Sequence, residues 1–417
     1  MEARLRSEEL FFAKEAAEYL GITTQRLNKL VQEGKVHPLK KNASGSVFHI
    51  EELNRRKEEL AIFSKVQQDG KKNMFSIDTK VKNEALNFAT LMNTLGSTEN
   101  KLDPIFSEFA KVQDVSVPIP EKVEDYTAFF GVNNDRLIHE YKKAQEAFSC
   151  LKKNDEIIKR GSDDYPLLLL KTKQAPRFLY IRGKKSLLFE TRTVALVGSR
   201  QASPSSKENT RRLAIALGKN GITVVSGLAK GIDVTAHKAA LDNGFNTIAV
   251  IGTNLNQYYP IENKEVQLEI EKRGLVISQF SPASKTERYF FPIRNGVMSG
   301  LSLATVIMEA GETSGALKQA DYALKQGRQV IIPKKALEIE TITWPKRFVE
   351  KGAIIASNPA EVLRALADNN IFRVTDKNEP VRQTTVPVQQ TLDDYFNNQE
   401  MDSNDVAQWP NPVLIEE

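Results

Sequence analysis

The sequence predicts an α/β protein whose main domain is a doubly wound parallel sheet. Short β-branched apolar runs recur between residues 160 and 368, amphipathic stretches separate them, and glycine-containing turns follow them. Strands that alternate with helices in this way run parallel, with right-handed crossovers. Ligands of such sheets sit beyond the carboxyl ends of the strands. We therefore expect the function to lie on the turns at that edge, here called the rim: VGSR, SGLAKGID, IGTNLNQYYP and MEAGETSG, with the nearby segments YYPIENK and FFPIRNG.

The local pattern predicts each element of this domain in turn. The run TRTVALVGSR is a strand that ends in a glycine turn, after which Ser203 can cap and Pro204 can open the helix KENTRRLAIALGKNG. Gly221 ends that helix, and ITVVSGLA is the next strand. The remaining elements are a helix through AHKAALDNG, the strand FNTIAVIGT, the helix NKEVQLEIEKRG, the strands LVISQF and LATVIMEA, the helix SGALKQADYALKQG, the strands RQVIIP and AIIAS, and the helix NPAEVLRALADN.

Length and composition limit the class of protein. At roughly 100–200 residues per domain, the 417 residues allow two to four domains. A formal net charge of +5 fits a nucleic-acid partner without requiring one. The single cysteine, Cys150, excludes an internal disulfide and favours a cytoplasmic location. The four histidines are scattered, so we expect neither a metal nor a cofactor. No apolar run is long enough to span a membrane.

Changes in composition divide the chain into four segments. Residues 1–57 form a small compact unit, and residues 58–159 read as a charged helical connector. Residues 160–368 are the α/β domain, and residues 369–417 read as a disordered acidic tail. From Gln383 onward the sequence has no Lys or Arg.

The first rim turn is Gly198-Ser199-Arg200, and its residue types suit a phosphate. Glycine lets the backbone approach an anion, the helix that follows favours negative charge at its N-terminus, and Arg200 adds a planar donor. The alternative is an ordinary tight turn of an α/β protein. The turn does not match the dinucleotide-binding fingerprint, because the second and third glycines are missing.

The second rim turn, SGLAKGID, again combines glycines with a lysine. Ser226, Gly227, Lys230 and Gly231 are candidate phosphate-binding residues. We expect Asp233 to cap the next helix without a chemical role. His237 on that helix has no Cys, Ser or second His at a triad spacing, which favours a packing role.

The segments YYPIENK and FFPIRNG each place two aromatic residues and a proline before a polar pair. Aromatic rings beside Lys264, Arg294 and Asn295 could stack on bases while the polar groups contact phosphates. The alternative is that at least one ring of each pair is a core residue. Asp233, Glu262 and Glu309 also lie on the rim, without an obvious nucleophile–base pair. The rim thus favours holding a polyanion over transforming a small molecule.

Taken together, these motifs resemble the DprA/Smf family. The matching segments, within residues 164–335, are YPLLL, APRFLYIRG, VALVGSRQAS, SGLAKGIDVTAHKAAL, TIAVIG, YPIEN, FPIRN and SGALKQA. The resemblance implies a Rossmann-like fold, single-stranded DNA binding in recombination or natural transformation, a homodimer, and recruitment of RecA recombinase. It places the DNA contacts at Arg200, Ser226, Gly227, Lys230, Lys264, Arg294 and Asn295.

The sequence departs from the family pattern at two rim positions. Gln279 replaces the acid of the usual SEFP segment, and Gly296 replaces the second arginine of the usual RNR triplet. The second change removes a positive charge from the expected DNA path.

The N-terminal unit reads as helix, turn, helix and hairpin, and it resembles the winged helix-turn-helix of MerR and excisionase proteins. This resemblance implies duplex-DNA contacts from Gln25, Arg26 and Lys29 on the second helix, and from Lys35, Lys40 and Lys41 on the wing. The alternative is a protein-interaction module of the same shape.

The tail contains QQTLDDYF, which resembles a sliding-clamp-binding box through Gln389, Leu392, Tyr395 and Phe396. The alternative is a segment that docks on its own domain.

Two other functions remain open at this point. Related Rossmann-like domains include nucleotide-processing enzymes of the LOG type, so a nucleotide sensor or enzyme is one alternative. The PGG.GT..E loop of those enzymes is replaced here by MEAGETSGAL, which argues against phosphoribohydrolase chemistry. The other alternative is a transcription regulator that reads duplex DNA through its N-terminal unit.

Overall fold

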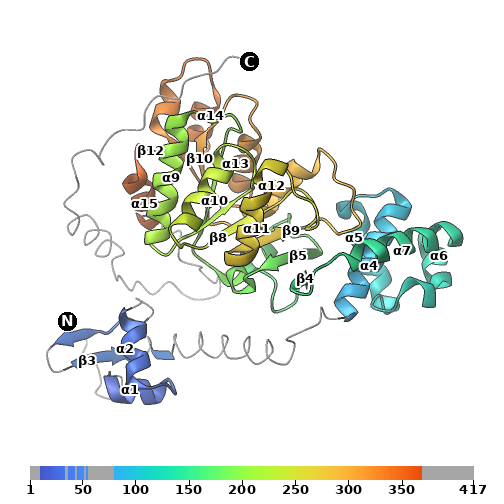
Figure 1. The fold of residues 1–417 in the computed structure, drawn as a ribbon, viewed down its shortest axis with the longest axis horizontal. Helices are drawn as coiled ribbons and strands as arrows, with labels where there is room; N and C mark the ends of the chain where they lie inside the picture. Colours follow the sequence, from blue (N-terminus) through green and yellow to red (C-terminus); the bar gives the residue numbers. More distant parts are fainter. Residues whose placement is uncertain (1–9, 33–35, 43–44, 51–52, 55–78, 369–417) are drawn as a thin grey trace. The chain divides into compact units, whose positions relative to one another are not determined.

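A computed structural model describes residues 10–32, 36–42, 45–50, 53–54 and 79–368 (Figure 1). The chain separates into two compact units, one on each side of the boundary between residues 76 and 77.

The first unit is a small helical pair with a three-stranded sheet. Its elements are β1 (Leu10–Phe12), α1 (Ala13–Tyr19), α2 (Thr24–Gln32), β2 (Lys40–Asn42) and β3 (Gly45–His49). The strand β3 pairs antiparallel with both β1 and β2. Gly21, with φ of +65°, turns the chain between the helices, and the Thr23 hydroxyl accepts from the N–H of Arg26 at 3.2 Å. The predicted order of helix, turn, helix and hairpin is confirmed.

The second unit begins with a cluster of helices. They are α4 (Thr79–Leu95), α5 (Glu99–Val112), α6 (Val123–Phe130) and α7 (Asn134–Ser149). Aromatic rings fill the space between them, and the ring centroids of Phe109 and Tyr126 lie 4.7 Å apart. The structure confirms the helical prediction for residues 79–149, whereas residues 155–159 form the strand β4, and residues 58–78 lie outside the described residues.

A nine-stranded sheet follows, in the order β12-β11-β10-β6-β7-β8-β9-β5-β4. The strands from β12 to β9 in this order run parallel to their neighbours, whereas β5 pairs antiparallel with both β9 and β4. Their bounds are β4 (Asp155–Lys159), β5 (Phe178–Gly183), β6 (Thr193–Gly198), β7 (Thr223–Ser226), β8 (Thr247–Val250), β9 (Leu275–Ser278), β10 (Ala304–Glu309), β11 (Gln329–Pro333) and β12 (Ile354–Ala356).

The doubly wound parallel sheet is thus confirmed, with two antiparallel strands at one edge that the pattern did not predict. The sheet starts at Asp155, five residues before the α/β domain was expected to begin. The strand β4 (DEIIK) has charged residues at three of its five positions, the first a buried aspartate, so it lacks the apolar composition of the central strands.

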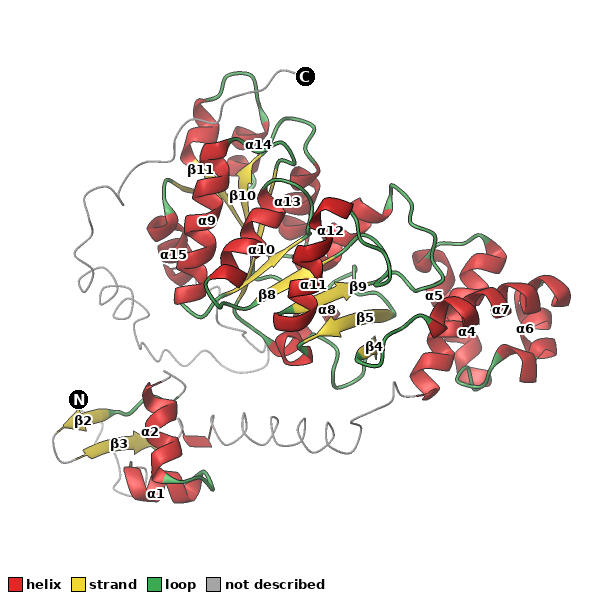
Figure 2. Ribbon diagram, in the orientation of Figure 1, coloured by secondary structure: helices red, strands yellow, loops and turns green. Residues whose placement is uncertain are grey.

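Helices cover both faces of the sheet (Figure 2). One face packs α9 (Pro204–Lys219), α10 (Ile232–Asp242), α11 (Lys264–Arg273) and α15 (Pro359–Asp368), and the other packs α8 (Leu167–Leu170), α12 (Phe290–Gly300), α13 (Gly315–Lys325) and α14 (Trp344–Glu350). Alternate residues of each strand serve the two faces: Val194 and Leu196 join one core cluster, and Ala195 joins the other.

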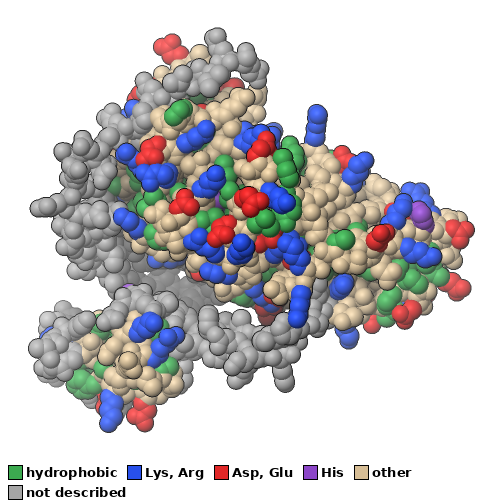
Figure 3. Space-filling model, in the orientation of Figure 1, with side chains coloured by type: hydrophobic (Ala, Val, Ile, Leu, Met, Phe, Trp, Pro, Cys, Tyr) green, Lys and Arg blue, Asp and Glu red, His purple; other side chains and the backbone are tan. Residues whose placement is uncertain are grey.

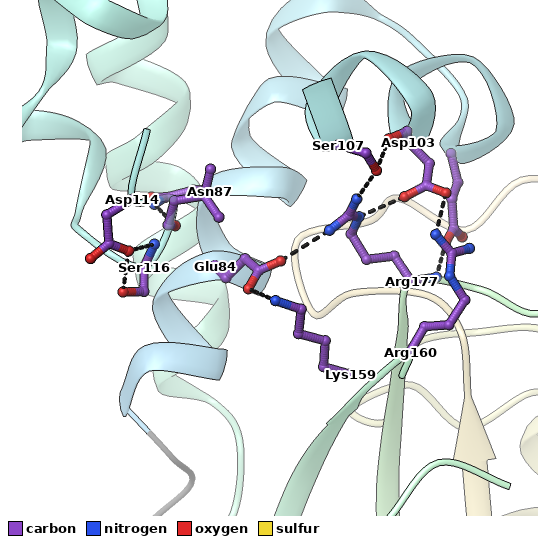
Figure 4. Close-up of polar contacts among 11 residues, drawn as sticks. Glu84, Asn87, Asp103, Ser107, Asp114, Ser116, Lys159, Arg160 and Arg177 are labelled. Carbon is purple, nitrogen blue, oxygen red and sulfur yellow. Dashed lines mark hydrogen bonds and ion pairs between the residues drawn. The ribbon is translucent and has the colours of Figure 1, made fainter. Parts of the chain in front are cut away.

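The helices α4 to α7 gather beside the β4–β5 edge of the sheet (Figure 1), and their core is continuous with it. Charged side chains join the two parts (Figure 4). The buried guanidinium of Arg177 pairs with Asp103 at 2.6 Å and with Glu84 at 3.0 Å, and it also donates to Ser107. Lys159 pairs with the same Glu84 at 2.5 Å. We call this set of residues, together with Arg160, the junction network.

Candidate nucleic-acid interface

The loop between β6 and α9 lies at the centre of the sheet. It contains Gly198, Ser199 and Arg200, where β6 stands between β10 and β7 and the winding of the sheet reverses. The N–H of Ser199 donates to the carbonyl of Glu309, at the end of β10, at 2.7 Å. A Cβ on Gly198 would lie 2.5 Å from the side chain of Ile232 and 2.8 Å from the same carbonyl. A glycine is therefore required for these loops to approach one another.

The N-terminus of α9 already holds a carboxylate of the protein. Glu309 accepts from the Ser203 N–H at 3.1 Å and from the Ser203 hydroxyl at 2.6 Å. Ser203 accepts in turn from the N–H of Ser206 at 3.2 Å, so its predicted role as a helix cap is confirmed, and Pro204 opens the helix as expected. The phosphate-binding role of Gly198 and Ser199 stays a prediction, and Glu309 competes with an external anion for this helix end.

The loop between β7 and α10 is held from inside. Ser226 is fully buried, and its hydroxyl donates to the carbonyl of Leu196 at 2.6 Å. Gly231 has φ of +73°, and a Cβ there would lie 2.2 Å from the carbonyl oxygen of Ser199. Asn263 is buried, and its amide donates to the carbonyl of Leu228 at 2.9 Å. These contacts make the rim loops one tightly packed layer.

Arg294 lies beneath this layer. The segment FFPIRNG begins α12 rather than a loop, so Arg294 points into the protein and is only 5% exposed. Its guanidinium donates to the carbonyl of Gly227 at 2.7 Å and to the carbonyl of Val250. A Cβ on Gly227 would lie 2.1 Å from that guanidinium. Arg294 therefore orders the ends of β7 and β8. A contact with DNA would be a second role of the same side chain.

Asp233 faces the same cluster. Its carboxylate accepts from the N–H groups of Gly227 at 3.1 Å and of Ala229 at 3.4 Å. The expectation that Asp233 caps the helix is wrong, because Gly231 occupies the N-cap position of α10, no side chain caps that end, and the Asp233 carboxylate turns back to the loop. Burial raises the pKa of Asp233, while the charge of Arg294 opposes that rise. Burial also lowers the pKa of Arg294 to about 10, with the charge of Asp233 opposing that change.

His237 is a core residue, as the packing interpretation expected. It is fully buried, and its Nδ1 lies 2.8 Å from the hydroxyl of Thr247, which donates to the carbonyl of Val224 at 3.0 Å. Because that hydroxyl donates elsewhere, Nδ1 carries the proton and donates to it. Burial lowers the pKa of His237 to about 3, so the ring is a poor base at neutral pH.

The exposed cations of the rim lie above these buried groups. Arg200, Lys230 and Lys264 are exposed, and Asn295 is partly buried. Lys230 pairs with Glu262 at 2.7 Å, and both side chains are more than half exposed, so the pair is weak and solvent-screened. The ammonium of Lys264 lies 5.4 Å from the centroid of the Tyr258 ring. On the face seen in Figure 3, basic and acidic side chains are interspersed over α9, α10 and α11. This face therefore has no continuous positive patch.

The rim aromatics divide into core and surface rings. Phe290 is 7% exposed and stacks on Phe280 with centroids 3.9 Å apart, so one ring of its pair is a core residue as expected. Tyr259 is 51% exposed, and its ring lies 5.1 Å from that of Phe291. Phe291 packs over Gly252, where a Cβ would come within 2.5 Å of the ring. Tyr259 is the ring of these that is open for base stacking.

The two departures from the family pattern have different surroundings. Gly296 is buried, and a Cβ there would lie 2.7 Å from the side chain of Gln174, so a side chain at this position would require Gln174 to move. The side-chain oxygen of Gln279 is buried without a hydrogen-bond partner among the described residues.

Comparison with known proteins decides the family. A sequence model of the DNA recombination-mediator protein A family matches residues 156–367. The chain belongs to this family. Curated relatives in the family include the DNA processing protein DprA of Streptococcus pneumoniae, which is 37% identical over 236 residues, covering 56% of this chain and 79% of the relative. Protein Smf of Synechocystis is 35% identical over 217 residues, covering 51% of this chain and 54% of the relative.

The structural comparison agrees with this assignment. The X-ray structure of DprA from Streptococcus pneumoniae matches with a TM-score of 0.53 and 29% identity, covering 68% of this chain and 95% of that structure. The Rossmann-like α/β fold is thereby confirmed. The matched region spans about half the length of some family members, such as the Synechocystis protein.

Two kinds of feature are absent from the part of the chain that the structure describes. No helix there has the length and apolar character needed to cross a membrane. No group of three or more His, Cys, Asp or Glu side chains among the described residues could hold a metal ion.

Proposed function

We propose that this protein binds single-stranded DNA on the rim and acts in DNA recombination or natural transformation without catalysing a reaction. The observation that carries the proposal is the contrast between a rigid loop layer and the exposed Arg200, Lys230 and Lys264 above it. Because the backbone that carries these cations is already ordered, binding a phosphate backbone costs little conformational entropy in the loops. The exposed ring of Tyr259 adds a surface for a base.

The chemistry of the rim supports binding over catalysis. The one histidine of this region, His237, is buried with its pKa lowered to about 3, and the hydroxyl of Ser226 donates to a backbone carbonyl. Neither group is placed to activate a nucleophile near neutral pH. A nucleotide sensor or nucleotide-processing enzyme is the alternative, and it predicts saturable binding or turnover of free nucleotides.

The family resemblance supports two partners. We propose that the protein forms a homodimer and that it recruits RecA recombinase to the bound strand. Sedimentation at several protein concentrations tests the first, and capture of RecA by the protein on immobilised single strands tests the second.

The experiment for strand binding compares two triple variants of equal charge. Arg200→Ala, Lys230→Ala and Lys264→Ala remove the rim cations. Lys219→Ala, Lys272→Ala and Lys325→Ala remove three exposed lysines at the carboxyl ends of α9, α11 and α13, on the opposite edge of the sheet.

Fluorescence anisotropy of a labelled single strand over a range of salt concentrations gives the measurement. The rim variant should bind far more weakly, and its salt slope should fall by about 2, at about 0.7 per lost phosphate contact. In the control variant, the single-strand affinity and the salt slope should both change much less than in the rim variant. Equal losses in the two variants would show unspecific attraction to positive charge and would overturn the proposal. Duplex and free nucleotides serve as competitors.

A second candidate function concerns duplex DNA. Gln25, Arg26 and Lys29 are exposed on α2, and Lys29 follows Arg26 by three residues and Gln25 by four, which places it on the same side of the helix as both. We propose that this side contacts duplex DNA, with Lys40 on the adjacent hairpin. Replacing the three α2 residues by Ala should abolish duplex binding and leave single-strand binding intact. Lys35 and the clamp-binding box formed by Gln389, Leu392, Tyr395 and Phe396 lie outside the described residues.

A further inference from the structure

A pocket opens between the helix cluster and the sheet, beyond the end of β9. Its walls come from five places: α4, the first turn of α5, the strand β5, the segment after β9, and the first turn of α12. None of the residues predicted to contact DNA lines it, so it is distinct from the cation cluster of the rim. It lies on the same edge of the sheet, because Gln279 and Phe280 directly follow the carboxyl end of β9.

Aromatic rings form much of the pocket wall, and the polar residues Thr98, Asn100, Ser281 and Ser284 also line it. Phe280 and Phe290 stack with an angle of 2° between their planes, and Phe88 meets Phe178 edge to face at 6.0 Å. At the mouth, Tyr289 is 50% exposed and its ring is perpendicular to that of Phe290. Such walls fit a planar aromatic ligand, which gains stacking as well as burial.

Two of the polar side chains in the lining could form hydrogen bonds with a ligand. The first is Gln279, whose side-chain oxygen is shielded from water and has no hydrogen-bond partner among the described residues. A buried amide oxygen without a partner is unfavourable. A ligand reaches this oxygen only when the Gln279 side chain turns toward the pocket, and a ligand that donates to it there would remove that cost. With the amide flipped, its N–H₂ would be the unpaired group, and the ligand would accept from it instead.

The second polar group is Glu99, in the first turn of α5. Its carboxyl accepts from the backbone N–H of Arg177. Burial raises the pKa of Glu99 to about 7, and the charge of Asp103 adds to the rise, whereas the Arg177 N–H and the charges of Arg160 and Arg177 oppose it. Near neutral pH this carboxyl is present in both protonation states, so it can donate to a ligand or accept from one.

The lining excludes other classes of ligand. It contains no Lys or Arg, so a phosphate has no counter-charge there and meets the carboxyl of Glu99 instead. An acyl chain would fill the apolar part and leave the Gln279 amide unpaired. A nucleobase satisfies both requirements, because it has an aromatic face and an edge of hydrogen-bond donors and acceptors.

We propose that this pocket binds a nucleobase, with its ring against the aromatic wall and its edge toward Gln279. The source of the base rests on the proposed function: a strand held by the rim cations would turn one base into the pocket. A free nucleoside presents the same chemistry, and the experiment below separates the two sources.

Photo-crosslinking tests the proposal on the full chain. Two probes are used, a single strand carrying one 5-iodouracil and free 5-iodo-2′-deoxyuridine, and the crosslinked residues are mapped by mass spectrometry. The expected result is a crosslink at Tyr289 or at the Phe280–Phe290 stack, reduced at least fivefold by an excess of unlabelled thymidine and unaffected by inorganic phosphate.

Two variants identify the groups that hold the base. Gln279→Leu keeps the size of the side chain and removes the amide, so it should reduce crosslinking severalfold. Tyr289→Ala should remove the crosslink at the mouth, while Tyr289→Phe, which keeps the ring, should retain the yield. Because Tyr289 is half exposed, neither change at this position should unfold the protein, and an unchanged thermal midpoint checks this.

The outcomes separate this proposal from the proposed function. A strand that binds but crosslinks only at Tyr259 or Phe291 overturns the pocket and leaves strand binding standing. A strand that does not bind, together with a free nucleoside that labels the pocket, supports a nucleoside site and overturns the strand proposal. Labelling of the pocket by neither probe, or labelling unchanged in Gln279→Leu, overturns the inference.

Discussion

The junction network and the rim use the same residue types in opposite ways. In the junction network, Arg177 is 7% exposed and pairs with two carboxylates, Glu84 and Asp103 (Figure 4). On the rim, Arg200 is exposed, and no ion pair to it is found among the described residues. A buried charge must be paired to be tolerated, whereas an exposed charge without a partner is available to an external one. The pairing of a charge, rather than its presence, thus separates stability from binding here.

Arg294 is an intermediate case. It is as buried as Arg177, yet it donates to two backbone carbonyls, and its charge faces Asp233 without an ion pair between them among the described residues. Arg294 therefore lies in a rim segment of the sequence, but its side chain has the surroundings of an interior residue. Four variants test how far this contrast holds, beginning with the one expected to have the largest effect on stability.

Arg177→Ala should destabilise the protein most. It leaves Glu84 and Asp103 without their shared buried partner, and removing one member of a buried ion pair costs about 3–5 kcal/mol. Urea unfolding gives the free energy. Arg160→Ala is the matched control, because Arg160 pairs with the same Asp103 at a more exposed position and should cost much less. Equal costs would show that burial does not govern the junction network.

Arg294→Met should have the next largest effect, with a loss of about 2–4 kcal/mol. The change keeps much of the packing volume but leaves the carbonyls of Gly227 and Val250 without their donor. Single-strand affinity should also fall because the loop layer loosens, while the salt slope should change less than in Arg200→Ala. A loss of affinity with unchanged stability would instead make Arg294 a direct DNA contact.

The pH dependence of stability should reveal Glu99. Its pKa is about 7 in the folded protein and near its usual 4.5 in the unfolded chain, so the folded state holds the proton more tightly. The stabilisation that comes from this proton is fully present below pH 4.5, and it is lost as the pH rises through 7. The loss is about 1–3 kcal/mol, since the side chain is only partly buried. Unfolding of wild type and Glu99→Gln at pH 4.5 and pH 8 measures it, and identical pH profiles would contradict the assignment.

Arg200→Ala should have the smallest effect on stability, within about 0.5 kcal/mol, because the side chain is exposed. Its effect on single-strand binding should be clear, with a salt slope reduced by about 0.7. Anisotropy and urea unfolding on the same preparation separate the two quantities. If stability fell as far as in Arg294→Met, the distinction between exposed and buried rim arginines would fail.

Much of the fold could be predicted from local patterns. The strands that precede Gly198 and Gly227 and the cap at Ser203 follow from short stretches of sequence, because apolar period, turn glycines and capping hydroxyls act over a few residues. The strand β4 was missed because three of its five residues are charged. The strand β5 has the apolar and aromatic run FLYI that predicts a strand, but its antiparallel place beside β9 depends on packing that this run does not encode. The role of Asp233 was missed for a different reason: its partners Gly227 and Ala229 are close in sequence, but the conformation of their loop decides which N–H groups reach the carboxylate.

The sequence by itself determined the doubly wound sheet, the family motifs and the residue types of the rim. Only the tertiary structure decided which of those residues reach solvent. Arg200 and Arg294 stand in comparable motifs. The helix α12 starts at Phe290 and places Arg294 beneath Gly227, whereas Arg200, in the loop after β6, is exposed. The physical reason is that burial depends on how elements distant along the chain pack together, and motif spacing contains no information about that packing.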